Sequence, residues 1–123
     1  MTTLRDLLYS SKYVPDELSE KVKTHVPIVE MPEQVKVNEV FKVRIRINHP
    51  LRHDHSIRRV MIYFIEDGKN LPVQIASINL EAPYAEPEIE LSMKFEKGGS
   101  IIIVSYCNLH GLWEEVKRIQ VIA

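Results

Sequence analysis

The chain has 123 residues, a formal net charge of −1 and an apolar fraction of 45%. This length suits one ordinary domain, and the apolar fraction is that of a globular protein and not of a disordered one. A nearly neutral chain has no general attraction for nucleic acid or for an anionic membrane. The longest apolar run, residues 101–104, is far too short to cross a bilayer. Residues 1–9 lack the apolar core and the small-residue cleavage site of a signal peptide.

The amino-terminal segment, residues 1–23, has a helical or irregular pattern. Leu4, Leu7 and Leu8 follow one another at helix spacing, and a second short turn is expected to begin near Asp16. We interpret this segment as an extension that caps the domain or packs on a neighbouring subunit. Residues 1–123 are therefore expected to form a single domain that carries this extension.

From His25 onward the sequence predicts strands. Residues 42–48 alternate cleanly between apolar and basic side chains, and residues 73–80 change parity midway, which predicts a β-bulge. The predicted strands cover residues 42–48, 57–66, 73–80, 89–95, 101–107 and 116–122. Six or seven short strands with turn signals between them are typical of an all-β protein, an antiparallel β-sandwich in which each sheet buries one face.

The side chains that could carry chemistry lie outside these patterns. All five histidines and the single cysteine fall at expected strand ends or in loops, where functional groups are often placed. They are His25, His49, His53, His55, Cys107 and His110. Imidazole and thiolate ligands select iron, copper or zinc over magnesium or calcium. One cysteine rules out a disulfide within the chain and fits a reducing compartment, which we expect to be the cytoplasm.

The spacing of these donors indicates a metal site. A Cys-x-x-His turn lets Cys107 and His110 reach one metal ion from one short loop. His49 and His55 lie six positions apart in another loop, and His25 lies upstream. One such element alone is a weak signal, but their combination favours a metal centre.

Three segments also carry a resemblance to a known family. HVP at 25–27, HPLRHDHSI at 49–57 and SYCNLHGLWE at 105–114 resemble the motifs of the superoxide reductase family. The chain looks like its short, one-iron, neelaredoxin-type members, which lack a rubredoxin-like domain. The resemblance implies an immunoglobulin-like sandwich of about seven strands that holds one mononuclear iron. The implied ligands are four histidines in a plane, with a cysteine on the axis: His25, His49, His55, His110 and Cys107. His53 has no ligand counterpart and is expected to be solvated.

The same resemblance implies an oxidoreductase. Its reaction is the one-electron reduction of superoxide to hydrogen peroxide at iron whose sixth position is open. The iron is then re-reduced by rubredoxin or a similar electron donor. Short members of the family tend to be homotetramers, so a homotetramer is the expected assembly.

One departure from the family pattern concerns the two residues before the HVP motif. Many members have glutamate and lysine there, the first capping ferric iron and the second steering the substrate. This chain has Lys23 and Thr24 at those places, and they are the candidate catalytic residues. Lys23 is displaced by one residue from the usual lysine, and it is either a substitute for it or a solvated surface charge. Arg52 and His53 are further candidates to supply positive charge.

Three other functions remain open at this point. A cupredoxin-like copper electron carrier is also a β-sandwich with a late Cys/His loop, but it uses an axial methionine, and no methionine follows Cys107. A non-catalytic immunoglobulin-like binding module needs neither a thiol nor clustered imidazoles. A zinc hydrolase is disfavoured because a thiolate and four histidines exceed what a tetrahedral ion takes.

Overall fold

The structure is a computed structural model that describes residues 2–123. Its helical elements are confined to the amino-terminal segment: α1 (Leu4–Leu7), the 3-10 helix η1 (Asp16–Lys21) and α2 (Val22–His25). The strands are β1 (Tyr9–Ser10), β2 (Ile28–Glu30), β3 (Gln34–Lys36), β4 (Phe41–Arg46), β5 (Ile57–Glu66), β6 (Val73–Asn79), β7 (Glu88–Met93), β8 (Gly99–Cys107) and β9 (Gly111–Ile122).

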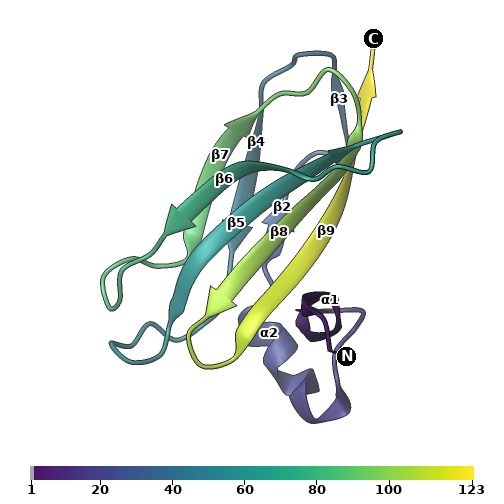
Figure 1. Cartoon of the computed structure of the whole chain (residues 1–123). Coiled ribbons are helices and arrows are strands. Elements are labelled where there is room, and N and C mark those ends of the chain that lie inside the picture. Colours follow the sequence, from purple (N-terminus) through teal and green to yellow (C-terminus); the bar gives the residue numbers. More distant parts are fainter. Residues whose placement is uncertain (1) are drawn as a thin grey trace.

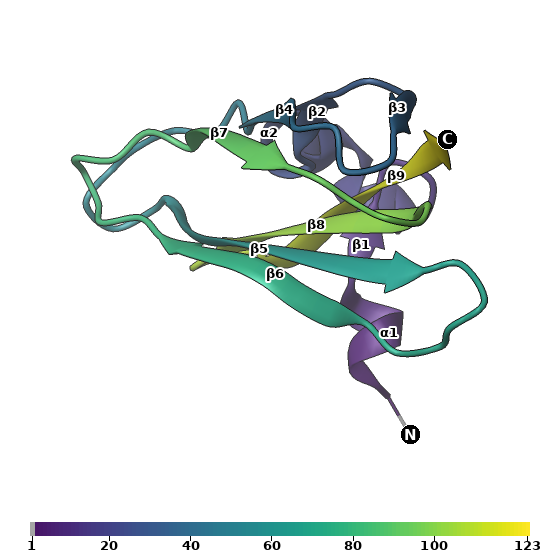
Figure 2. The same cartoon turned by 90° about the horizontal axis from the view of Figure 1, so that it is seen from above.

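The strands form two layers that face one another (Figures 1 and 2). One sheet has the order β1-β9-β8-β5-β6, with β3 also paired to β9, and the other has the order β2-β4-β7. All pairs are antiparallel except β1 with β9 and β3 with β9, which are parallel. The prediction of an all-β sandwich is therefore confirmed, with two short parallel pairs added at one edge.

The core lies between the layers, and the strand patterns explain why. In β4 the side chains of Phe41, Val43 and Ile45 are buried while the residues between them are exposed. Facing them, β5 and β8 supply Ile62 and Ile103, both with no exposed surface. Alternation places one apolar face of each sheet against the other, because successive side chains of a strand point to opposite faces.

The predicted strands coincide closely with the observed ones, and so does the predicted bulge. Along the β5–β6 ladder Ile62 pairs with Ala76 whereas Tyr63 pairs with Gln74, so Ile75 is the extra residue. β9 begins at Gly111, earlier than predicted. The strands β1, β2 and β3 were not predicted, because two or three residues are too few to show an alternating pattern.

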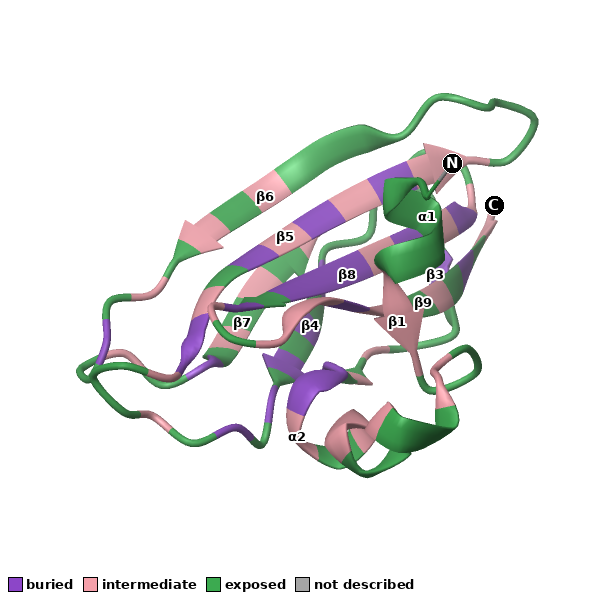
Figure 3. Cartoon of the chain, turned by 60° about the horizontal axis from the view of Figure 1, so that its bottom comes forward, coloured by how far each residue is buried: buried purple, intermediate pink, exposed green. Residues whose placement is uncertain are grey.

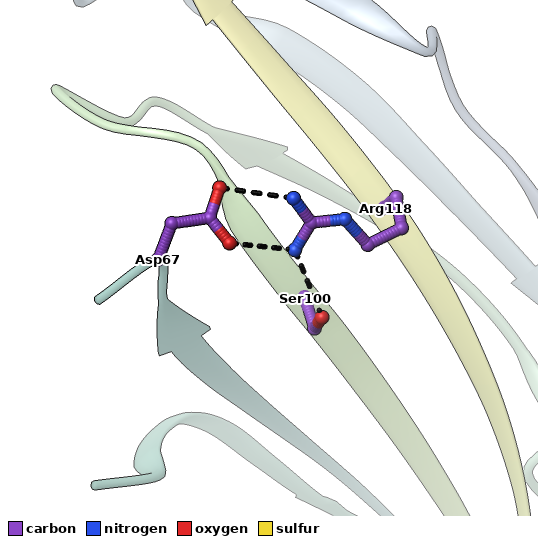
Figure 4. Close-up of polar contacts among 3 residues, drawn as sticks. All are labelled: Asp67, Ser100 and Arg118. Atoms are coloured by element: carbon purple, nitrogen blue, oxygen red, sulfur yellow. Dashed lines mark hydrogen bonds and ion pairs between the residues drawn. The ribbon is translucent and has the colours of Figure 1, made fainter. Parts of the chain in front are cut away.

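One ion pair joins the turn after β5 to β9 at one end of the sandwich. Arg118 of β9 donates to both carboxylate oxygens of Asp67, at 2.7 and 2.9 Å, and to the Ser100 hydroxyl at 3.2 Å (Figure 4). The Arg118 guanidinium holds the pKa of Asp67 below its usual value. Both side chains are more than half exposed, so the pair fixes local geometry more than it stabilises the fold.

The amino-terminal segment confirms one expectation and corrects another. The predicted helical turn does begin at Asp16. His25 was expected in a loop or at a strand end. It is instead the last residue of α2. The sequence did not predict this short helix, because its four residues include a threonine and a valine, which have only modest helix propensity. Nowhere in residues 2–123 is a helix long and apolar enough to cross a membrane.

Truncation of a core side chain tests this packing. We expect Ile62→Ala to lower the free energy of unfolding by about 2–4 kcal/mol, because Ile62 is fully buried between the sheets. Urea unfolding followed by circular dichroism measures the change. Ile75→Ala is the matched control, since that side chain is 39% exposed on β6. Equal losses in the two variants would contradict the proposed core.

Candidate metal centre

Three segments that carry metal-binding residues, namely α2, the β4–β5 loop and the β8–β9 turn, lie at one end of the sandwich (Figures 1 and 3). His25 ends α2, and His49 and His55 lie in the loop between β4 and β5. Cys107 is the last residue of β8, and His110 lies in the turn before β9. The five predicted ligands therefore lie together, and three separate segments of the chain deliver them to one place.

The four imidazole rings stand at the corners of a near-square. The centroid of the His49 ring lies 4.6 Å from that of His25 and 4.5 Å from that of His55. The centroid of His110 lies 5.1 Å from each of the same two rings. The diagonal from His25 to His55 is 6.5 Å, which makes the corner at His49 close to a right angle. The four rings therefore cluster closely around one place.

The sulfur of Cys107 is the fifth donor. Its Sγ lies 3.4 Å from His49 Nε2 and 3.7 Å from His110 Nδ1. The Cys107 side chain has no exposed surface and belongs to the apolar core, whereas His55 and His110 are half-buried. The sulfur therefore reaches the imidazoles from the protein interior, where His25 and His49 are also buried, and His55 and His110 are the rings that are partly exposed to solvent.

Backbone carbonyls fix the tautomers of two of the rings. His25 Nδ1 lies 3.0 Å from the carbonyl oxygen of Lys21, and His49 Nδ1 lies 2.7 Å from that of Pro50. A carbonyl can only accept, so each Nδ1 must carry the proton, and each Nε2 presents its lone pair. This is the usual way in which a protein orients a metal-binding imidazole.

The distances between donor atoms fit a shared metal ion. His25 Nε2 lies 3.2 Å from His110 Nδ1, and two donors at about 2.0–2.3 Å from one ion are roughly 3–3.7 Å apart. Donor atoms of His25, His55, Cys107 and His110 all lie within 4.8 Å of one another. Within the described chain, His55 Nε2 is buried without a hydrogen-bond partner, which a metal bond would resolve. These four donors thus fit one ion, and His49 lies outside this group of mutually close donor atoms.

The electrostatics of the cluster favour neutral imidazoles. Burial lowers the pKa of His25 to about 4. Burial is also the main cause that lowers the pKa of His49 and of His110. Neutral rings are the form that binds a metal, so protons compete weakly for this site near neutral pH.

Two buried residues, Ser105 and Trp113, hold His25 and His110 in place. The Ser105 hydroxyl donates to the His25 carbonyl at 2.6 Å, which ties α2 to β8. The fully buried Trp113 ring lies 5.0 Å from the His25 ring, and its indole nitrogen donates to the His110 carbonyl at 3.1 Å. Packing of the sandwich therefore determines where these imidazoles point.

A further contact joins the two loops that carry the other donors. Asn108 accepts from the Ser56 amide at 3.0 Å and donates to the Asp54 carbonyl at 2.8 Å. Asn108 lies in the Cys-x-x-His turn, and Ser56 directly follows His55. The contact keeps the turn against the β4–β5 loop, so that the two motifs form one site.

The other predicted residues have different positions. His53 is exposed, as expected of a solvated residue. Lys23 is exposed too, and the Thr24 hydroxyl lies 2.8 Å from His25 Nδ1 and 3.2 Å from the Lys21 carbonyl. Thr24 thus contacts the face of His25 that points away from the donor cluster, where it can orient the ring.

Sequence reasoning missed Lys21. Its carbonyl accepts from His25 Nδ1, and its positive charge contributes to the lowered pKa of both His25 and His110. The signal that could have found it is the helical spacing of four residues between Lys21 and His25, which places both on one side of a turn.

Fold and site together define a β-sandwich protein with one mononuclear His/Cys metal centre at an open end. The desulfoferrodoxin family model matches residues 17–116. A superoxide reductase from Pyrococcus furiosus is 31% identical over 110 residues, which cover 76% of this chain and 86% of that protein. A neelaredoxin from Megalodesulfovibrio gigas is 28% identical over 115 residues, which cover 80% and 88%.

Solved structures agree with these matches. The superoxide reductase (neelaredoxin) from Ignicoccus hospitalis superposes with a TM-score of 0.91 at 39% identity, covering 98% of this chain and all of that one. A variant of that protein gives a TM-score of 0.95 at 40% identity over 99% of this chain and all of the variant. This chain belongs to the desulfoferrodoxin family.

The lowered histidine pKa values predict how pH changes the stability of the metal-free protein. An unfolded histidine has a pKa of about 6.5, so below this pH the unfolded chain binds protons that the folded chain excludes. We expect stability to fall as pH decreases from about 6.5 to about 5, a range in which most carboxylates stay ionised. Urea midpoints of the metal-free protein at a series of pH values measure this effect.

The control is His53→Gln, whose side chain is exposed, and it should leave this pH dependence unchanged. A midpoint that stays constant across that range would contradict the burial of neutral imidazoles.

Proposed function

We propose that this protein is a superoxide reductase with one iron, which reduces superoxide to hydrogen peroxide. The observation that carries the proposal is the cluster of four imidazoles around a buried thiol, with two of the imidazoles, His55 and His110, partly exposed to solvent. A resident metal held by five protein donors keeps one position open for a small substrate. Membership of the desulfoferrodoxin family supports the same assignment.

The proposed iron ligands are the four imidazoles and the thiolate, namely His25, His49, His55, His110 and Cys107. His49 belongs with the other four because its Nε2 lies 3.4 Å from the Cys107 sulfur and its ring completes the square. The other ring nitrogen of His49 is already bonded to the Pro50 carbonyl, so Nε2 is the atom left for the metal.

Iron bound by these residues would supply the one electron that, together with two protons, converts superoxide to hydrogen peroxide. The protein residues determine access and orientation. The Cys107 thiol lies on the core side of the cluster, so an incoming anion would enter past the partly exposed His55 and His110. Burial keeps His25 and His49 neutral, which leaves their nitrogen lone pairs available to a metal. Trp113, fully buried against His25, excludes water from the inner side.

The competing functions are less compatible with this geometry. A cupredoxin-like copper carrier uses two histidines, a cysteine and a weak axial methionine, and it would leave two of the clustered imidazoles unused. A tetrahedral zinc ion also has no place for a fifth donor. A binding module without a metal would not require His55 Nε2 to be buried with no partner in the described chain.

We also propose a homotetramer, supported by an apolar groove on the outer face of the larger sheet. Its lining residues include Leu8, Met61, Ile102 and Leu112. Proteins rarely leave such a face in contact with water unless a partner covers it. The charged residues at this groove include both Arg58 and Glu114, so one copy can complement another.

Four finer proposals follow from the same assignment. The chain acts as one iron-binding unit, with residues 1–23 as an extension that leads into His25. Rubredoxin or a similar carrier re-reduces the iron, which stoichiometric oxidation of reduced rubredoxin during superoxide turnover would test. Lys23 remains a candidate for steering substrate. The protein is cytoplasmic, in keeping with its single reduced thiol; cell fractionation tests this.

The metal assignment predicts a spectroscopic signature. Purified protein should hold about one iron per chain and, after oxidation, show a thiolate-to-iron charge-transfer band that Cys107→Ser abolishes. His55→Ala and His49→Ala should each weaken iron binding at least about tenfold, whereas His53→Ala should not, because that ring is exposed. Metal analysis, visible spectroscopy and superoxide consumption measure these effects. A blue copper band, or a colourless protein after reconstitution with iron, would contradict the assignment.

The assembly prediction concerns the outer face of the larger sheet. Light scattering should give the mass of a tetramer for the natural protein and a smaller mass for Met61→Lys, because a charge in the apolar groove opposes burial. Ser92→Lys, on an exposed position of β7, is the control and should stay tetrameric. A monomeric natural protein would contradict the proposed assembly.

A further inference from the structure

Two aromatic side chains connect the metal centre to the surface of the amino-terminal segment. We propose that Trp113 and Tyr9 form a radical-transfer path, which carries an oxidising equivalent from the site to solvent when hydrogen peroxide reacts there. The path would protect the site from the product of its own reaction. The proposal rests on the proposed function for the iron and for the peroxide, and it gives the amino-terminal segment a chemical role.

The path begins at a proposed metal ligand. The centroid of the Trp113 ring lies 5.0 Å from that of the His25 imidazole, and the centroid of the Tyr9 ring lies 5.3 Å from that of Trp113. Aromatic rings in contact have centroids about 4.5–7 Å apart. Because electron tunnelling becomes much slower as distance grows, two steps between touching rings are faster than one long step. Trp113 thus bridges the ligand and Tyr9.

The pairing of β1 with β9 holds the second ring in place. Tyr9 of β1 lies directly beside Trp113 of β9 in a parallel register. The Trp113 side chain has no exposed surface, whereas Tyr9 is only half-buried. The two rings therefore lead from the core beside His25 to a position that water reaches.

The surroundings of the two rings give the transfer a direction. The Trp113 indole nitrogen donates to the His110 carbonyl at 3.1 Å, and a carbonyl oxygen accepts a hydrogen bond without removing the proton. An oxidised indole would thus remain a buried cation, which is unfavourable in an apolar interior. Taking an electron from Tyr9 neutralises this cation. The Tyr9 phenol can release its proton to water, so the oxidising equivalent moves outward.

The chemistry balances with reagents of stated class. One molecule of hydrogen peroxide takes one electron from ferrous iron and one from Trp113, and with two protons it becomes two molecules of water. Trp113 recovers its electron from Tyr9, which loses one proton and becomes a neutral radical. A small one-electron reductant in solution, such as a thiol or ascorbate, restores Tyr9 with one electron and one proton. The electron donor of the proposed function re-reduces the iron.

Two tyrosine variants form a matched pair. Tyr9→Phe keeps an aromatic ring against Trp113 and removes the phenol, so packing is retained while the end of the path is lost. Tyr106→Phe is the control. Tyr106 directly precedes Cys107 in the chain, but it is 39% exposed between the buried Ser105 and Cys107, so its side chain points to the opposite face of β8. Both variants should bind iron like the natural protein.

The experiment mixes the reduced, iron-loaded protein with a small molar excess of hydrogen peroxide, with no added reductant. Electron paramagnetic resonance of freeze-quenched samples detects a tyrosyl radical. Fluorescence of the samples after denaturation reports Trp113, because the chain has one tryptophan. Zinc-loaded protein is the metal control, since zinc has no redox chemistry, and it should give no radical.

We expect the natural protein and Tyr106→Phe to form the tyrosyl radical and to keep their indole fluorescence. Tyr9→Phe should lose the radical and also lose indole fluorescence, because the oxidising equivalent then stays on Trp113. Peptide mass spectrometry should find added oxygen on Trp113 in this variant.

The proposal would be overturned by a natural protein that forms no tyrosyl radical, by a radical that persists in Tyr9→Phe, or by one that disappears in Tyr106→Phe. A radical in the zinc-loaded protein would overturn it too. Failure of the proposed function has a different signature. An iron-loaded protein that does not consume superoxide contradicts that function, while the peroxide experiment still decides the path. A protein that binds no iron contradicts both proposals, and metal analysis shows this directly.

Discussion

The thiol of Cys107 belongs at once to the apolar core and to the metal centre, and the rest of the structure depends on this double position. β8 is the central strand of the larger sheet, paired with β5 on one side and β9 on the other, and Cys107 is its last residue. Core packing therefore fixes the sulfur before any metal is considered. The three segments that carry the histidines must then meet around a point that the sandwich has already determined.

Burial also sets the chemistry of the imidazoles. A histidine that loses water resists protonation, which lowers its pKa and keeps its nitrogen lone pair available. Carbonyl acceptors at Lys21 and Pro50 then decide which nitrogen faces inward. Placing four polar rings together at the end of the sandwich costs folding free energy. The clearest sign is His55 Nε2, which is buried and lacks a protein partner in the described chain. A metal ion bound there would offset that cost, because its bond to His55 Nε2 would replace the missing partner.

The amino-terminal segment contributes more than a cap. β1 pairs with β9 so that Tyr9 lies beside Trp113, with ring centroids 5.3 Å apart, and Trp113 in turn lies against His25. The segment then returns through η1 and α2 and places Lys21 one turn before His25. Residues far from the ligand motifs therefore determine the orientation of one proposed ligand.

Much of this protein was predictable from its sequence. The alternation of residues 42–48 and the parity change in residues 73–80 predicted a strand and a bulge, because the two-residue period of a strand is a local property. The Cys-x-x-His turn and the histidine pair at 49 and 55 indicated a metal centre, since donor spacing within one loop is also local. Only the tertiary structure placed His25 on a helix, paired β1 and β3 in parallel with β9, and set the Lys21 carbonyl against the His25 imidazole. These features depend on contacts between distant segments, and very short elements carry no periodic pattern that would reveal them.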